Sequence, residues 1–301
     1  MELLISVVIP VYNGEKTIGE TLQSVLNQTY KNLEVVVIND GSKDSTAAIV
    51  EEFQDNRIKL CSYPNAGLAA SRNRGIDQSS GDYISFTDAD DVWTPEKLAD
   101  QLTVLKQHPD AAVAYSWTDY IDEQSQFLQA GTHISASGNV FAKLLEINFI
   151  ESGSNVLIRR DALKTVGDFD VTLTAAEDWD MWLRLAKKYE FVAVPSVQVL
   201  YRRMLSMSSN VVRQERECVK VLERALVDAP ESLQQLKRKS LAKLYKYLIF
   251  KALEGPPGPS KAWLTAKCLG QAIRYNPSLL GQSKVVLSVV AKIVAALFEK
   301  K

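Results

Sequence analysis

The 301-residue sequence predicts an α/β fold in which helices flank a mostly parallel β-sheet, with a helical appendage at the C-terminal end. Short apolar, β-rich runs alternate with helical stretches through the first part of the chain, which is typical of a parallel sheet covered on both faces. After about residue 205 the β signals disappear. We therefore expect an α/β domain at residues 1–205 and a helical region at residues 206–301.

The first elements form a strand–helix–strand unit. Residues 4–9 and 33–38 are apolar runs, and the stretch between them places four apolar side chains on one helical face: Ile18, Leu22, Val25 and Leu26. The alternation continues with a helix near 43–53, a strand near 57–62, a helix near 67–78 and a strand at 82–86. Ligands of such sheets collect beyond the carboxyl ends of the strands.

The helical region is expected to hold helices near residues 209–228, 231–253, 261–274 and 281–299. The segment Gly255-Pro256-Pro257-Gly258-Pro259 separates two of them, because prolines and glycines at this density cannot continue a helix. We read the region as a small helical appendage to the α/β domain.

The formal net charge of −1 conceals opposite charges on the two regions. Residues 1–204 carry 18 Lys and Arg against 29 Asp and Glu, a net charge of −11, whereas residues 205–301 carry 17 against 7, a net charge of +10. A basic region suits an anionic surface such as phospholipid head groups, and no nucleic-acid partner is expected. The alternative is that the two regions simply attract each other.

Cysteine usage and the N-terminus indicate a cytoplasmic protein. Cys61, Cys218 and Cys268 are far apart and odd in number, which fits neither a disulfide framework nor a metal site. The N-terminus begins with an acidic residue and its apolar run breaks at Pro10, so it lacks the features of a signal peptide.

Polar clusters follow three of the expected strands, at residues 12–14, 39–42 and 87–91. Each cluster alone is consistent with a turn, since Asn, Asp and Gly are common turn residues. Three clusters at one rim of one sheet indicate a binding site.

The segment Asp88-Ala89-Asp90-Asp91 places three carboxylates within four residues, directly after an apolar strand. Such crowding is electrostatically costly unless a cation compensates it. Mg²⁺ or Mn²⁺ suits this role, because one or two carboxylates hold such an ion and leave positions for phosphate oxygens. The alternative is an acidic turn that caps the helix beginning around Thr94-Pro95-Glu96, and this explains Asp91 better than the other two acids.

Five motifs together resemble glycosyltransferase family 2, whose catalytic domain has the GT-A fold. The resemblance covers residues 4–205, and although each motif is weak alone, their order and spacing are specific. The motifs are Val8-Ile9-Pro10-Val11-Tyr12-Asn13, Asn39-Asp40-Gly41-Ser42-Lys43-Asp44-Ser45-Thr46, Asn65-Ala66-Gly67-Leu68-Ala69-Ala70-Ser71-Arg72-Asn73, Asp88-Ala89-Asp90-Asp91 and Glu177-Asp178-Trp179-Asp180.

The resemblance implies that Pro10, Tyr12, Asn13 and Asp40 line a pocket for the nucleotide base. Asp40 would accept a hydrogen bond from a base N–H, and Tyr12 would offer an aromatic face. Asp40 can equally close an Asx-turn with Gly41, and both roles can hold together.

The resemblance also assigns Asn65, Gly67 and Arg72 to donor binding, with Gly67 permitting close backbone approach and Arg72 offsetting diphosphate charge. Arg72 as an ordinary surface residue of a helix is the alternative. Asp88 would face the ribose, with Asp88 and Asp90 on the metal side of the site, Asp90 holding an ion that bridges the two phosphates.

Glu177-Asp178-Trp179-Asp180 begins an amphipathic helix, and helical spacing places Glu177, Asp180 and Arg184 on one stripe. Asp178 shares its side with apolar residues, so its carboxylate is expected to point inward. The family pattern makes Asp178 the general base and Glu177 its neighbour in acceptor binding. The alternative is that both acids only stabilise a helix N-terminus.

The family often has a histidine after a Tyr-Arg pair, but here Tyr201-Arg202-Arg203 is followed by Met204. Arg202 or Arg203 can take over a phosphate contact or be a solvated charge at the strand end. Ser152, Gly153, Ser154 and Asn155 are candidates for an acceptor-side wall. Residues 131–138 are either a mobile lid or an ordinary surface loop.

Residues 285–298 are strongly apolar, with Lys284, Ser288 and Lys292 on one narrow polar stripe. Fourteen helical residues reach about 21 Å, which is too short for a membrane span. An amphipathic helix in a basic region can instead lie on an anionic membrane, at the inner face of the cell membrane. Packing against the other tail helices or a second subunit is the alternative.

The expected function is inverting transfer of a sugar from a nucleoside diphosphate donor to a hydroxyl of a glycan or lipid-linked acceptor. The base-pocket motif favours UDP, with dTDP or GDP as alternatives. Nucleotidyl transfer is a second class, but no glycine-rich basic loop follows the first strand to hold a triphosphate. A non-catalytic sugar-nucleotide or glycan-binding module is a third, and the presence of Asp90 and Asp178 argues against it.

Overall fold

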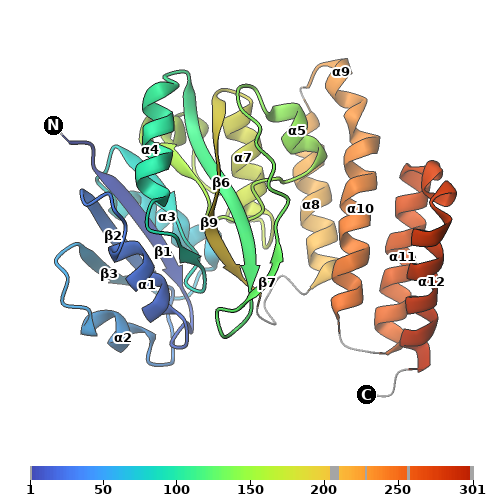
Figure 1. Cartoon of the computed structure of the whole chain (residues 1–301), viewed down its shortest axis with the longest axis horizontal. Coiled ribbons are helices and arrows are strands. Elements are labelled where there is room, and N and C mark those ends of the chain that lie inside the picture. Colours follow the sequence, from blue (N-terminus) through green and yellow to red (C-terminus); the bar gives the residue numbers. More distant parts are fainter. Residues whose placement is uncertain (1, 204–209, 228, 256–257, 299–301) are drawn as a thin grey trace. The chain divides into compact units, whose positions relative to one another are not determined.

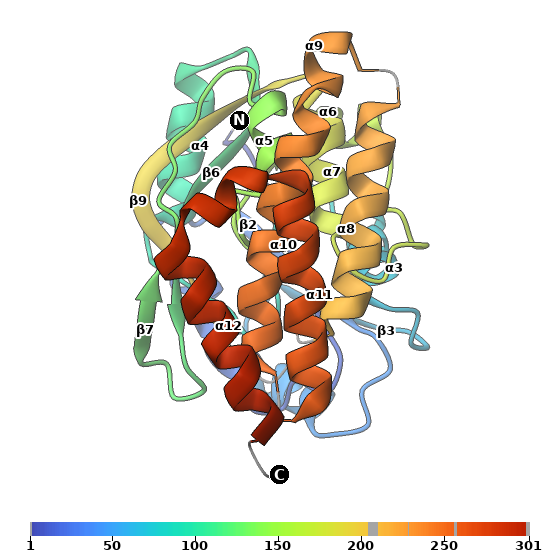
Figure 2. The same cartoon turned by 90° about the vertical axis from the view of Figure 1, so that its right-hand side faces the viewer.

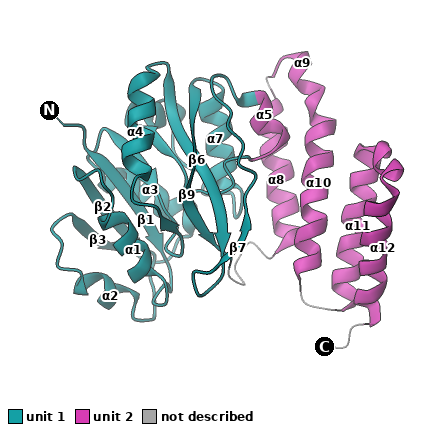
Figure 3. Ribbon diagram, viewed as in Figure 1, with its two compact units in different colours: residues 1–141, 149–204 teal, residues 142–148, 205–301 magenta. Residues whose placement is uncertain are grey.

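The structure is a computed structural model that describes residues 2–203, 210–227, 229–255 and 258–298. The chain forms two compact units, one of residues 1–141 and 149–204 and the other of residues 142–148 and 205–301 (Figure 3). The short segment 142–148, which contains most of helix α5 (Phe141–Glu146), groups with the helical unit. The sequence did not predict that residues 142–148 belong to the helical unit.

The first half of the sheet is parallel (Figure 1). Its strands run in the order β3-β2-β1-β4, with β1 at Ile5–Val11, β2 at Leu33–Asn39, β3 at Ile58–Ser62 and β4 at Tyr83–Phe86. The connecting helices are α1 (Ile18–Leu26), α2 (Thr46–Glu52) and α3 (Leu68–Gln78). Every strand and helix expected up to residue 86 is present.

The second half of the sheet is mixed. It contains β5 (Val92–Trp93), β6 (Ala111–Ile121), β7 (Phe127–Ala130), β8 (Leu157–Arg159) and β9 (Glu190–Arg202). β8 lies antiparallel between β4 and β6, β7 returns from β6 as a hairpin, and β9 runs parallel to β6. All strand pairs are therefore parallel from β3 to β4, as expected, whereas beyond β4 the parallel pair β6–β9 is combined with antiparallel pairs. Three helices belong to this half: α4 (Lys97–Gln107), α6 (Arg160–Val166) and α7 (Glu177–Ala186).

The core lies on both faces of the central strands. All seven residues of β1 are buried, as its continuous apolar sequence predicts for a strand covered on both sides. One face packs against the apolar stripe of α1, formed by Ile18, Leu22 and Val25. Helix α3 packs against β1 and β2, and α4 packs against β6 and β9.

The second unit is helical (Figure 2). It contains α8 (Val211–Leu226), α9 (Glu231–Gln234), α10 (Leu236–Glu254), α11 (Pro259–Tyr275), the 3₁₀ helix η2 (Pro277–Gly281) and α12 (Ser283–Phe298). Helices α10, α11 and α12 lie side by side. Proline at the first position of α11 explains its start, since its missing N–H is unpaired there in any helix. None of the helices described is both long and apolar enough to cross a membrane.

Candidate active site

The polar clusters predicted to gather at one rim do follow β1, β2 and β4 in the parallel half of the sheet. Because these strands run in the same direction, their carboxyl ends meet at the same edge. The site candidates after β1, β2 and β4 therefore share one side of the first unit.

Asp40 is buried at the end of β2 and accepts hydrogen bonds from the backbone N–H groups of Ala66 and Gly67, at 2.9 and 2.8 Å. Arg74 forms an ion pair with the same carboxylate at 2.9 Å. The turn after β2 is closed by Asn39, whose Oδ1 accepts from the Ser42 N–H, so Asp40 is not the residue that closes it. Asp40 instead links β2 to the start of α3, and its contact with a base stays a prediction.

Tyr12 and Asn13, which follow β1, are exposed and lie near Asp40 at the end of the neighbouring strand. Asn13 has a left-handed backbone, φ +52°, and its side-chain oxygen accepts from the Lys43 N–H at 2.9 Å. Tyr12 is 50% exposed, which leaves its ring available, whereas Pro10 is buried within β1.

The segment before α3 is exposed at Asn65 and at Gly67. Gly67 has φ +89° at the N-cap of α3, a conformation that glycine adopts without steric cost. A ligand can therefore approach the backbone here closely.

Arg72 is a buried cation that contacts two acids of the candidate site. Its guanidinium is only 2% exposed and donates to Asp88 Oδ1 and to Glu177 Oε1, both at 2.8 Å. It also lies over the ring of Phe169, 5.4 Å from the centroid. Arg72 is thus not the surface residue that the alternative described, and its predicted contact with a diphosphate is not tested by this geometry.

Gly153 makes room for this guanidinium. A Cβ atom at position 153 would lie 2.4 Å from Nη2 of Arg72. Glycine is therefore required for the observed position of Arg72, and the loop before β8 contacts the site through its backbone.

Asp90 and Asp88 are the predicted metal ligands. Burial and the neighbouring charge of Asp88 raise the pKa of Asp90 to about 6. Among the described residues, no cluster of three or more His, Cys, Asp or Glu side chains is arranged to hold a metal ion. Two carboxylates with hard oxygen atoms nevertheless suit Mg²⁺ or Mn²⁺, because such ions keep positions for water and phosphate oxygens.

Asp91 has a supporting role that the sequence did not reveal. It is fully buried and accepts from the hydroxyls of Ser152 and Ser154 and from the Arg202 N–H. Burial, with the charges of Asp90 and Asp88, raises its pKa well above the usual value. The helix after it begins at Lys97 with no side-chain cap, so Asp91 does not cap α4 as the alternative proposed.

The segment Ser152, Gly153, Ser154 and Asn155 is buried. Asn155 donates to Ser116 O and to Thr118 Oγ1, and Ser154 Oγ accepts from the Asp88 N–H at 2.9 Å. These side chains support the acidic loop after β4 from within. Their contact with an acceptor stays a prediction.

Glu177 and Asp178 begin α7. Asp178 Oδ1 accepts from the Trp179 N–H at 2.7 Å, and burial and the charge of Glu177 raise its pKa to about 7 while Arg72 opposes the shift. Glu177 is buried because it pairs with Arg72, whereas the neighbouring Asp178 is half-buried. Helical spacing predicted Glu177, Asp180 and Arg184 on one stripe. Asp180 and Arg184 do form an ion pair at 2.8 Å, whereas Glu177 pairs with Arg72.

Arg202 is neither a solvated charge nor free for phosphate. Its side chain is 1% exposed and donates to the Asp90 carbonyl, to Ser125 Oγ and to Glu20 Oε2. Arg202 therefore fixes the backbone of the acidic loop. The neighbouring Arg203 lies over the ring of Tyr120, and Met204 is outside the described residues.

The loop at residues 131–138 carries a histidine that sequence reasoning set aside. His133 Nε2 lies 2.7 Å from Asp119 Oδ1, and its ring stacks on Trp117 with centroids 4.7 Å apart. These contacts fix the loop to the end of β6. Whether the loop moves as a lid stays a prediction.

Two solved structures share the fold of this chain over most of its length. S. aureus TarS, residues 1–349, superposes with a TM-score of 0.67 at 20% identity, covering 98% of this chain and 89% of that one. A mannosyltransferase from Pyrobaculum calidifontis, in complex with GDP-Man and Mn²⁺, gives a TM-score of 0.60 at 19% identity and covers 98% and 86%. The likeness confirms the expected GT-A-type α/β fold with C-terminal helices.

The model of the family described as glycosyltransferase like family 2 matches residues 6–252, and the chain belongs to this family. A UDP-Glc:alpha-D-GlcNAc-diphosphoundecaprenol beta-1,3-glucosyltransferase of Escherichia coli, WfgD, is 32% identical over 209 residues, or 69% of this chain and 79% of that protein. An uncharacterized glycosyltransferase of Rickettsia typhi is 32% identical over 200 residues, covering 64% of this chain. The match spans only 60% of that relative's length, and 27% of one from Rickettsia bellii.

Proposed function

We propose that this protein is a metal-dependent, inverting glycosyltransferase that moves a sugar from a nucleoside diphosphate donor to a hydroxyl acceptor in polysaccharide synthesis. One observation carries the proposal most directly. Arg72 bonds Asp88 on one side and Glu177 on the other, so the acidic loop after β4 and the acidic start of α7 belong to one site. Transfer between two bound substrates requires that the donor-side and acceptor-side groups are held near each other, which a shared cation between Asp88 and Glu177 supports.

The donor base would bind next to Pro10, Tyr12, Asn13 and Asp40, with the exposed Tyr12 ring against the base. Asn65 and Gly67 would line the next part of the donor. UDP is the favoured nucleotide. Two observations support this choice: the sequence motif around Asp40, and a relative whose name gives UDP-Glc as its donor.

Asp90, with Asp88, would hold Mn²⁺ or Mg²⁺. Such an ion supplies charge neutralisation for the departing diphosphate. The raised pKa of Asp90 supports this assignment, since a carboxylate that burial and a like charge destabilise gains from a cation. Arg202 and Asp91 would keep the loop in place by their backbone and hydroxyl contacts.

Asp178 would remove the proton of the acceptor hydroxyl as that oxygen attacks the anomeric carbon, with the nucleoside diphosphate leaving from the opposite face. A general base is most effective when its pKa lies near the working pH, and the pKa of Asp178 is raised to about 7. Glu177 would stay bound to Arg72 and position the start of α7 beside the acceptor.

The acceptor would be a glycan or a lipid-linked sugar, and the protein would act in the cytoplasm at the inner face of the membrane. The name of the Escherichia coli relative gives a sugar-diphosphoundecaprenol acceptor. In α12 the large apolar side chains of Leu287, Val294 and Leu297 are exposed, which supports contact with a lipid surface.

A panel of nucleotide sugars with Mn²⁺ or Mg²⁺ tests the proposal. Released nucleoside diphosphate is measured with and without metal, and the anomeric configuration of any product by NMR. UDP release that requires the metal and gives an inverted product is the expected result. Pyrophosphate release would indicate nucleotidyl transfer instead, and donor binding without turnover would indicate a binding module.

A further inference from the structure

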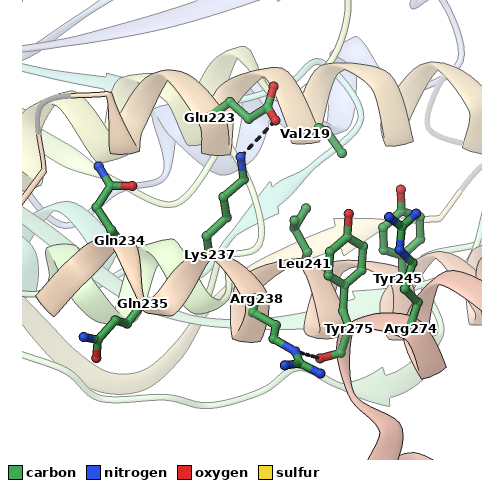
Figure 4. A pocket seen from close by; sticks show the side chains of 10 residues that line it. All are labelled: Val219, Glu223, Gln234, Gln235, Lys237, Arg238, Leu241, Tyr245, Arg274 and Tyr275. Carbon is green, nitrogen blue, oxygen red and sulfur yellow. Dashed lines mark hydrogen bonds and ion pairs between the residues drawn. The ribbon is translucent and has the colours of Figure 1, made fainter. Parts of the chain in front are cut away.

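A hollow in the helical unit lies outside the site described above (Figure 4). Its volume is about 540 Å³, and its walls come from α8, α9, α10 and the C-terminal end of α11. The polar and aromatic side chains that matter for its chemistry are Glu223, Lys237, Arg238, Tyr245, Arg274 and Tyr275. We call this hollow the basic pocket.

Three cations and one anion line the basic pocket. Lys237 pairs with Glu223 at 3.1 Å, and Arg238 uses Nε to donate to the Tyr275 carbonyl at 2.9 Å, as Figure 4 shows. In the described part of the chain neither Arg238 nor Arg274 has an ion-pair partner. The terminal nitrogens of Arg238 and the guanidinium of Arg274 are therefore available to a ligand.

Two aromatic side chains form another part of the wall. The rings of Tyr245 and Tyr275 stack with centroids 5.7 Å apart and planes 10° apart. The Tyr245 hydroxyl donates to Glu215 at 2.9 Å, so this hydroxyl is already hydrogen-bonded within the unit. The pocket thus combines a stacked pair of aromatic rings with three cationic side chains.

The charge of the pocket selects the class of ligand. Three cations against one carboxylate leave two positive charges uncompensated, and like charges brought together around a cavity repel each other unless an anion binds. Two arginines present planar, forked donors that match phosphate oxygens. A dianionic phosphate group balances the pocket, whereas a single carboxylate does not.

We propose that the basic pocket binds a phosphate-bearing anion through Lys237, Arg238 and Arg274. The phosphate belongs either to a soluble compound or to the head group of an anionic phospholipid, since both present the same oxygens. This binding is independent of the proposed glycosyl transfer, because every residue of the pocket lies in the helical unit.

The test uses the full-length protein and two probes in EDTA, which removes metal-assisted binding elsewhere. Calorimetric titration with pyrophosphate measures the soluble source, and co-sedimentation with phosphatidylglycerol–phosphatidylcholine vesicles measures the lipid source. The pocket variants are Arg238→Gln and Arg274→Gln. Lys246→Gln is the matched control, since Lys246 is an exposed cation of α10 outside the pocket.

Each pocket variant should bind at least about tenfold more weakly than the wild type and Lys246→Gln, since a charge-assisted bond to phosphate is lost. Weakening in the pyrophosphate arm assigns a soluble phosphate, and weakening in the vesicle arm alone assigns a lipid head group. All three substitutions change exposed side chains and should leave the melting temperature unchanged. If the wild type binds neither probe, or the control loses as much affinity as the pocket variants, the proposal is wrong.

Discussion

The guanidinium of Arg72 and the carboxylate of Glu177 lie 2.8 Å apart in the interior of the first unit, although 105 residues separate them in the chain. A second nitrogen of the same guanidinium bonds Asp88. A single planar side chain therefore sets the spacing between the acidic loop after β4 and the start of α7. We therefore propose that Arg72 is a positioning residue for both halves of the candidate site.

Arg72→Lys should reduce transfer by about 10² or more while the protein stays folded, because an ammonium group cannot hold two carboxylates in a fixed planar arrangement. Steady-state kinetics would show the loss mainly in kcat. Arg57→Lys, in a surface pair with Asp55, is the control and should be silent. Unchanged kcat in Arg72→Lys would mean that the ion pairs of Arg72 with Asp88 and Glu177 have only a structural role.

Gly153→Ala should also disturb the ion pairs that Arg72 forms with Asp88 and Glu177. The added Cβ would meet Nη2 of Arg72 at 2.4 Å, and overpacking of this kind costs about 1–3 kcal/mol. Urea unfolding measures the cost, and the kinetic defect should resemble that of Arg72→Lys. Gly270→Ala, which meets no atom within 4 Å in the middle of α11, should instead stabilise the protein by about 0.5–1 kcal/mol.

Asp90→Ala should abolish metal-dependent turnover of the donor without unfolding the protein. The pKa of Asp90 is raised to about 6, so its ionised form is not stabilised by the fold and its removal costs little stability. Turnover at rising Mn²⁺ concentration is the measurement, with Asp77→Ala on the surface of α3 as the control. Near-normal turnover at saturating Mn²⁺ would contradict the assignment of Asp90 as a ligand.

Asp178→Asn should retain donor binding and lower transfer by about 10²–10⁴, the usual contribution of a general base. A base must be deprotonated to act, so wild-type kcat should rise with pH through about 7, and this limb should vanish in the variant. Asp168→Asn, at an exposed position, should keep the limb.

Asp178→Asn should stabilise the folded protein at alkaline pH, although it lowers transfer. The folded-state pKa of Asp178 is raised above the ordinary value of 3.8, so the folded protein holds this proton more tightly and loses stability as pH rises through about 7. Asp178→Asn should therefore melt at a higher temperature than the wild type at pH 8. Equal melting temperatures would mean that the carboxylate is not destabilised by burial.

Sequence reasoning succeeded where the signal is local. Continuous apolar runs identified β1 and β2, and the polar residues after them were placed at one rim because parallel strands share their direction. The sequence predicts a strand at residues 156–158, where β8 lies, but not the strands with which it pairs. β8 has three residues and lies antiparallel between β4 and β6, and nothing in its sequence states which strands it joins.

The sequence also does not predict which charged side chains are buried. Lys97 follows Thr94-Pro95-Glu96 and has the sequence context of a solvated helix start, yet it is fully buried with Nζ 3.8 Å from the centroid of the Trp93 ring. Arg202 has a strand-end context and is buried as well. The partners that make such burial tolerable come from other segments, so only the assembled fold reveals them.

Helix α12 packs within its unit through Val289 and Ala296 and leaves most of its large apolar side chains exposed. Leu287 is 66% exposed and Leu297 is 50% exposed. Lys284 and Lys292 are the charged residues of this helix, and they add to the net charge of +10 of residues 205–301. Exposed apolar area beside basic charge favours an anionic bilayer surface, where both contributions act together.

Full-length protein should therefore co-sediment with anionic vesicles at low salt and be released as salt is raised. A chain ending near Gly281 should bind much less while still hydrolysing the donor. Leu287→Ser with Leu297→Ser tests the same face without removing a helix, and Val171→Ser, at an exposed apolar position of the first unit, is the control. If the double variant binds vesicles as well as the wild type, or truncation unfolds the first unit, α12 is a structural helix and its exposed face has no role at the membrane.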